Sequence, residues 1–165
     1  FGGGSTSRLY RSLVIEQQIA LSAGSFYDAD KLGPSNFFIF ASPRPGVGMD
    51  QIENAVVAEI RKLRENGVSQ EELTRAKTGL QAEAIFARDS MGAGARVLGA
   101  ALSSGQTVVD VEAWPDRIGR VTADQIKAAA NAILRQKEAV TGYLLSDQPP
   151  PIQPQTNRPQ TKKGG

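Results

Sequence analysis

Residues 61–77, RKLRENGVSQEELTRAK, hold the strongest structural signal in the chain, a junction between two helices. Asn66-Gly67 has the form of a helix C-terminus, where glycine is the residue most often found just beyond the last turn. Ser69–Glu72 has the S-x-x-E spacing of a capping box, and Val68 and Leu73 occupy the hydrophobic staple positions. The stretch therefore predicts one helix ending near residue 66 and another beginning near residue 70.

Helical patterns extend from this junction in both directions. The preceding helix is predicted from an apolar stripe at steps of three and four residues, and the following helix is predicted to run to about Asp89. Thr122–Gln125 repeats the capping-box spacing, which predicts a last long helix to about Gln136. Two more helices are predicted over Met91–Ser104 and over Thr107–Arg120, the second interrupted at Pro115. The stripe of the preceding helix consists of Met49, Ile52, Val56, Ile60 and Leu63.

The remaining elements read as strands and one short helix. Ser7–Gln17 has apolar residues at helical spacing, whereas Ile19–Tyr27 alternates as a strand does. Phe37–Ala41 is a continuous apolar run, which predicts a second strand, buried on both faces and paired with the first as a hairpin. Ala139–Leu145 is predicted as a final strand. The fold class predicted is α+β, an antiparallel sheet with helices packed on one face.

Composition divides the chain into two parts. Its 165 residues suffice for one domain with a core, and five of its nine prolines fall between Pro149 and Pro159. We therefore expect an α+β domain over residues 1–147 and a Pro/Gln-rich disordered tail over residues 148–165. The glycines at Gly79, Gly94 and Gly99 lie inside predicted helices, which indicates close packing against a neighbouring element.

The absence of two residue types excludes most catalytic classes. The chain has no cysteine and no histidine, so thiolate or imidazole metal ligands, cysteine nucleophiles and Ser-His-Asp triads are excluded. A net charge of +2 without long basic runs argues against nucleic acid as a partner. No apolar stretch approaches the roughly 20 residues of a membrane span. The absence of cysteine fits a periplasm or a cytoplasm equally, so localisation stays open.

Few residues are candidates for a binding site. Gly2–Gly4 lacks the lysine and hydroxyl spacing of a phosphate loop and is interpreted as a flexible lead-in. Glu71 and Glu72 lie in the first turn of a capped helix, where the helix dipole favours negative charge. A structural role therefore explains both glutamates without a binding site. The substrate-contact or partner-contact candidates are polar residues of the first helix, with an ordinary solvated helix face as the alternative. They are Arg8, Tyr10 and Arg11.

Three stretches, in this order, resemble motifs of one family. Gly2–Leu13 resembles G-x-x-S-R-L-[FY]-x-x-L, and Arg61–Lys77 is similar to L-x-x-x-G-V-[ST]-x-x-E-L-x-x-A-K. Arg117–Ile126 resembles x-I-x-x-V-T-x-x-D-[IV], with Gln125 at the aspartate position. The family is that of the pitrilysin-type zinc metallopeptidases, which includes insulin-degrading enzyme and the mitochondrial processing peptidase. The resemblance spans residue 2 to about residue 147.

The resemblance implies a role without catalytic residues. Members of the family build a clamshell from homologous α+β domains, and an inverted H-x-x-E-H zinc site lies on the N-terminal half. A chain without histidine resembles the C-terminal half, which closes the chamber and contacts peptide substrate. The implied partners are the zinc-bearing N-terminal half, a second homologous subunit and the peptide. The implied cofactor, zinc, belongs to the parent protein's N-terminal half, so this chain would be part of a zinc metalloendopeptidase without holding metal itself.

Two departures from the family pattern leave alternatives open. Many relatives carry an arginine just after the first motif and a tyrosine seven residues later, whereas the matching positions here are Val14 and Leu21. The chain is then either the C-terminal domain of a zinc-bearing subunit or an inactive, structural core-type paralogue. The third alternative is an unrelated α+β interaction module whose Pro-rich tail recruits partners.

The second departure concerns the start of the domain. The family domain has a strand and a helix before its glycine-rich segment, which implies a sheet incomplete at its N-terminus, with an edge that associates with a partner.

Overall fold

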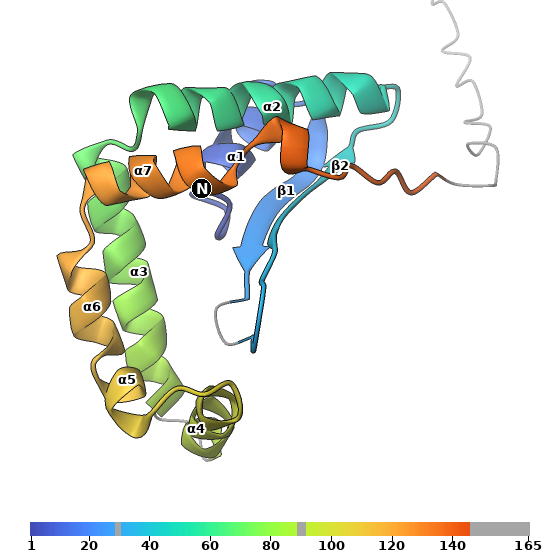
Figure 1. The fold of residues 1–165 in the computed structure, drawn as a ribbon. Coiled ribbons are helices and arrows are strands. Elements are labelled where there is room, and N and C mark those ends of the chain that lie inside the picture. Colours follow the sequence, from blue (N-terminus) through green and yellow to red (C-terminus); the bar gives the residue numbers. More distant parts are fainter. Residues whose placement is uncertain (29–30, 89–91, 146–165) are drawn as a thin grey trace, which may run out of the picture.

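A computed structural model describes residues 1–28, 31–88 and 92–145 of the chain. The predicted tail at 148–165 and the predicted helix end at Asp89 lie outside the described residues. Within the described part, helices pack on one face of a two-stranded antiparallel sheet (Figure 1). The predicted α+β class is confirmed.

The N-terminal segment forms a helix followed by a hairpin. The helix predicted over residues 7–17 consists of α1 (Arg8–Tyr10) and a π-helical turn η1 (Arg11–Glu16). The hairpin predicted from the alternating pattern is present as β1 (Ala20–Tyr27) and β2 (Phe37–Pro43). A Cβ added to Gly24 of β1 would lie 2.7 Å from the ring of Phe40 on β2, so only glycine lets that ring lie across the strand.

One apolar cluster lies between this hairpin and the helices above it. Leu9 and Leu13 are fully buried at its centre, and Ile39 of β2 packs against it from the sheet. We call α1, η1, β1, β2 and α2 (Met49–Asn66) the core region, because they surround this cluster. The other buried members of the cluster are Val14, Ile19, Ala20, Ala23 and Ile52.

Beyond the core region, the chain builds a layer of helices at an angle to α2. Figure 1 shows α6 beside α3 and α7 beside α2, with α4 at the far end. We call α3 to α6 the helical arm; α7 returns the chain to α2. The bounds are α3 (Gln70–Arg88), α4 (Ala93–Ser103), α5 (Val108–Glu112), α6 (Trp114–Arg120) and α7 (Ala123–Ile133).

Both predicted capping boxes are confirmed. The backbone N–H of Glu72 donates to Ser69 Oγ at 3.1 Å, and the Ser69 N–H donates to Glu72 Oε2 at 2.9 Å. Thr122 and Gln125 exchange the same pair of hydrogen bonds. Thr107 and Asp110 form a third box at the start of α5, which the sequence analysis did not identify.

The predicted final strand at Ala139–Leu145 is wrong. After α7 the chain makes a 3-10 turn, η2 (Gln136–Glu138), and residues 139–145 pair with no strand among those described. Thr141 donates to Glu53 Oε1 of α2 at 2.9 Å, and Tyr143 donates to the other oxygen of that carboxylate. A strand requires hydrogen bonds to a partner's backbone, which the local sequence does not specify.

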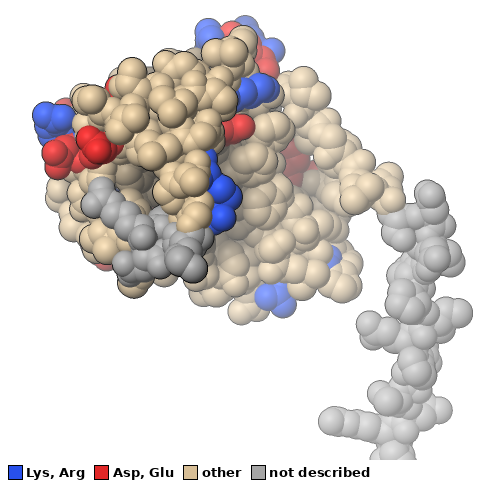
Figure 2. All heavy atoms as spheres, turned by 90° about the horizontal axis from the view of Figure 1, so that it is seen from below, with Lys and Arg blue, Asp and Glu red and all other residues tan. Residues whose placement is uncertain are grey.

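The prediction that the second strand is buried on both faces is also wrong. Phe38 and Phe40 are 47% and 51% exposed, because they point away from the core together with Phe26. Phe26 and Phe38 stack, with ring centroids 4.7 Å apart. Figure 2, seen from below, shows a face composed largely of uncharged residues.

The close packing predicted at the glycines of α3 and α4 is wrong as well, because a Cβ at Gly79, Gly94 or Gly99 would meet nothing within 4 Å.

Candidate functional site

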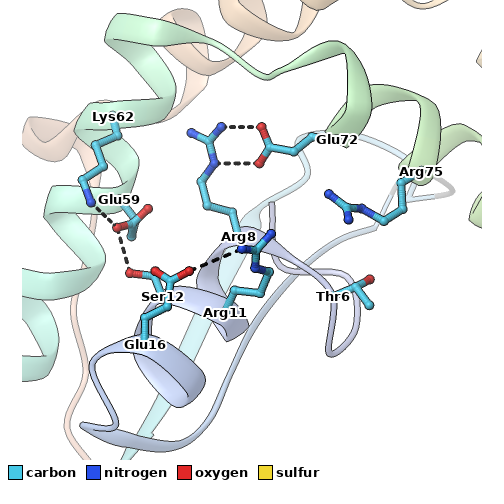
Figure 3. A pocket seen from close by; sticks show the side chains of 9 residues that line it. All are labelled: Thr6, Arg8, Arg11, Ser12, Glu16, Glu59, Lys62, Glu72 and Arg75. Atoms are coloured by element: carbon cyan, nitrogen blue, oxygen red, sulfur yellow. Dashed lines mark hydrogen bonds and ion pairs between the residues drawn. The ribbon is translucent and has the colours of Figure 1, made fainter.

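Arg8 joins the first helix to the α2–α3 junction. Its guanidinium donates to both carboxylate oxygens of Glu72, from Nε at 3.0 Å and from Nη2 at 2.7 Å, and also to the carbonyl oxygen of Gly67 at 3.0 Å (Figure 3). These hydrogen bonds from Arg8 lower the pKa of Glu72 to about 2, against burial, which raises it. Arg8 therefore holds the first helix against the junction between α2 and α3.

The other two residues proposed as contacts differ in their exposure. Tyr10 is half-buried and packs against the core cluster. Arg11 is exposed, and its only ion pair among the described residues is a single contact of 3.5 Å with Glu16. Of the two positions matching the family's Arg/Tyr pair, Val14 is buried in the core, whereas Leu21 is 58% exposed on β1.

A buried carboxylate in α2 escaped the sequence analysis. Glu59 is 3% exposed and accepts hydrogen bonds from Ser12 Oγ at 2.9 Å and from Lys62 Nζ at 2.7 Å. A signal for it was present, because Glu59 lies three residues after Val56 and four before Leu63. A charged residue at a stripe position predicts a buried ion pair.

These residues surround a polar hollow of about 180 Å³ between the N-terminal segment, α2 and α3. Figure 3 shows its side chains, four cations and three carboxylates, reaching inward from these elements. The lining consists of Thr6, Arg8, Arg11, Ser12, Glu16, Glu59, Lys62, Glu72 and Arg75. Such a lining can bind a charged group but offers no imidazole or thiol for catalysis.

The described ranges contain neither a candidate metal site nor a candidate membrane span. Across residues 1–28, 31–88 and 92–145, no group of three or more Asp, Glu, His or Cys side chains converges as metal ligands would. In the same ranges, no helix has the length and apolar character needed to cross a bilayer.

Comparison with known proteins relates both the N-terminal sequence and the fold to peptidases. Residues 1–80 match the family described as the peptidase M16 inactive domain. A comparison with curated protein sequences gives no match.

Solved structures share the fold over most of the chain. The inactive peptidase domain of a candidate zinc protease from Bordetella parapertussis superimposes with a TM-score of 0.73 at 24% identity, covering 87% of this chain and 78% of that one. A candidate zinc protease from Bordetella pertussis Tohama I gives the same TM-score and identity, with 88% and 79% covered. A protease from Helicobacter pylori gives 0.74 at 21% identity and covers 82% of this chain. This chain spans about a third (32%) of the length of the Helicobacter protein.

The resemblance to the non-catalytic domain of this peptidase family is therefore confirmed over residues 1–80. Beyond that limit, the Bordetella structures share the fold over most of the chain.

Proposed function

We propose that this chain is the non-catalytic half of a zinc metalloprotease, which closes a proteolytic chamber and holds peptide substrate. The zinc site would lie on a histidine-bearing N-terminal half, with a second homologous subunit completing the chamber. The observation that carries the proposal is the match of residues 1–80 to an inactive peptidase domain in a chain that contains no histidine. Zinc held by the other half would polarise the peptide carbonyl, and the residues of this chain would position the peptide.

The sheet offers a surface suited to that role. Among the described residues, β1 and β2 pair as strands only with each other. The outer edge of β1 is partly occupied, because the N–H of Ser25 donates to the carbonyl oxygen of Gly2 at 3.0 Å, so β2 offers the freer edge. An extended peptide can add to such an edge through main-chain hydrogen bonds. The exposed rings of Phe26, Phe38 and Phe40 lie on the face away from the helices, where they can accommodate apolar side chains.

Of the residues proposed as contacts, Arg11 fits substrate contact best. Its guanidinium is exposed and weakly paired, whereas Arg8 is held by Glu72 and Tyr10 packs on the core. Leu21, exposed on β1, would meet substrate through an apolar contact in place of the family's tyrosine.

Reconstitution tests this proposal. The purified chain is mixed with a histidine-bearing M16-type half from the same source, and hydrolysis of a fluorogenic peptide is measured for each component and for the mixture. We expect activity only in the mixture, and saturable peptide binding by the pair. A histidine-bearing half that is fully active without this chain would contradict the proposal.

A structural role without peptide binding is the second candidate. The observation that favours it is the replacement of the family's Arg/Tyr pair by Val14 and Leu21, because a buried valine cannot reach a substrate. Under this reading, the two halves would associate but the pair would bind no peptide saturably. The same titration separates the two candidates.

A further inference from the structure

The ion pairs around the polar hollow fall into two classes. Arg8–Glu72 and Lys62–Glu59 are short, each 2.7 Å, and each involves a carboxylate that is at least two-thirds buried. Arg11–Glu16 and Arg75–Glu71 are long, at 3.5 and 3.4 Å, and each rests on a single nitrogen–oxygen contact. All of these residues except Glu71 line the hollow.

The long pairs leave two guanidinium groups available. Exposed single-contact ion pairs contribute about 0–1 kcal/mol, so they exchange readily for a better acceptor. Glu71, the partner of Arg75, is 83% exposed and lies outside the hollow. Figure 3 shows Arg11 from η1 and Arg75 from α3 extending toward each other across the hollow, with Thr6 close by.

A third donor and a rigid frame complete the arrangement. Thr6 lines the hollow, and its hydroxyl makes no hydrogen bond with any residue that the structure describes. Arg8 and Lys62 hold Glu72 and Glu59 by short bonds, which neutralises two of the three carboxylates of the hollow. The third, Glu16, is 58% exposed, so solvent screens its charge. Two guanidinium forks facing one space match the geometry of a carboxylate or phosphate group.

We propose that this hollow is an oxyanion-binding site, in which Arg11 and Arg75 hold the anion from two sides and Thr6 donates a third hydrogen bond. The ligand class is a compact oxyanion, either inorganic phosphate or the terminal carboxylate of a peptide. The site does not depend on the chamber role proposed above, because it lies wholly within this chain.

Calorimetric titration of the full chain at low salt tests the site. The probes are inorganic phosphate, a short peptide with a free C-terminal carboxylate, and the same peptide amidated. We expect saturable binding of phosphate or of the free-acid peptide, and none of the amide; which of the two anions binds identifies the source. Raising the salt concentration weakens the binding, because screening acts on exposed charges.

Substitutions test whether these residues form the site. The double variant Arg11→Gln with Arg75→Gln is expected to weaken binding at least tenfold, because the loss of each hydrogen bond to a charged group lowers affinity by about a factor of ten or more. Arg61→Gln, on the exposed face of α2, removes one charge, as each of the single variants Arg11→Gln and Arg75→Gln does; it is the control for them and should shift affinity less than twofold. Circular dichroism checks that each variant is folded. If the double variant does not fold, the affinities of the two single variants are compared instead.

Two results would overturn the inference. One is no saturable binding of either anion by the unmodified chain. The other is an equal affinity for the anion in Arg61→Gln and in the single variants Arg11→Gln and Arg75→Gln. That result would show that binding depends only on the overall charge of the chain.

Discussion

The core region and the helical arm reach their folded state by different means. The core region buries one apolar cluster around Leu9 and Leu13, whereas the arm leaves Ile85 and Phe86 of α3 62% and 72% exposed. The arm is held instead by capping boxes and by side chains that donate to backbone, such as Lys77 to the carbonyl of Gly119 at 2.8 Å. Burial of apolar surface is the largest favourable contribution to folding. We therefore expect stability to reside in the core region and the arm to be the less stable part.

The largest expected effect comes from truncating the centre of the core region. Leu13→Ala removes a fully buried side chain and should lower the free energy of unfolding by about 2–5 kcal/mol. Leu32→Ala, at a position that is 76% exposed, is the matched control and should change it by less than about 0.5 kcal/mol. Urea denaturation measures both, and equal losses would remove the distinction between buried and exposed positions.

Glu72→Gln tests the connection between the core region and the arm. The pKa of Glu72 is lowered from 4.5 to about 2, so its contribution is present in full above about pH 4.5 and is lost as pH falls toward 2. That shift corresponds to at most about 3 kcal/mol, and contact with solvent reduces it to about 1–2 kcal/mol.

The pH dependence of unfolding supplies the readout for this variant. The unmodified chain should lose stability between pH 4.5 and 2 by a component that Glu72→Gln lacks. Glu71→Gln, one residue away and 83% exposed, should keep that component. Identical acid profiles in the unmodified chain and in Glu72→Gln would show that Arg8 and Glu72 do not stabilise the fold.

A smaller effect is expected at the start of α7. Thr122→Ala removes the side-chain acceptor of the Gln125 N–H and should cost about 1 kcal/mol, whereas Thr122→Ser keeps that acceptor and should cost less. Urea denaturation compares the two variants. An alanine variant as stable as the serine variant would mean that the capping box contributes nothing measurable here.

The smallest effect is expected in the arm. Phe86→Ala should change the free energy of unfolding by less than about 0.5 kcal/mol, because most of the ring already contacts solvent. Urea denaturation measures this change as well. A loss comparable to that of Leu13→Ala would show that the arm has a core of its own, and would contradict the comparison from which these predictions start.

Local signals in the sequence predicted most of the fold. Ser69–Glu72 and Thr122–Gln125 located two helix starts, because a capping box involves only residues three apart. The hairpin followed from alternation and a turn. Segment 139–145 was misread as a paired strand, since pairing depends on a second backbone that the local pattern does not specify.

The candidate site was less predictable. Arg8 was chosen as a contact from its helix position, but its pairing with Glu72 joins residues 64 apart in sequence, and no local pattern specifies such a pair. The outward orientation of Phe38 and Phe40 was missed because a continuous apolar run does not distinguish the two faces of a strand. Arg75, which shares the hollow with Arg11, was not among the candidates for the same non-local reason.

The most direct test of the functional account is the zinc content of the purified chain after dialysis against excess Zn²⁺, measured by elemental analysis alongside peptide hydrolysis. The account predicts no tightly bound zinc and no hydrolysis by the chain alone. Stoichiometric zinc, or peptide cleavage without a histidine-bearing half, would contradict it.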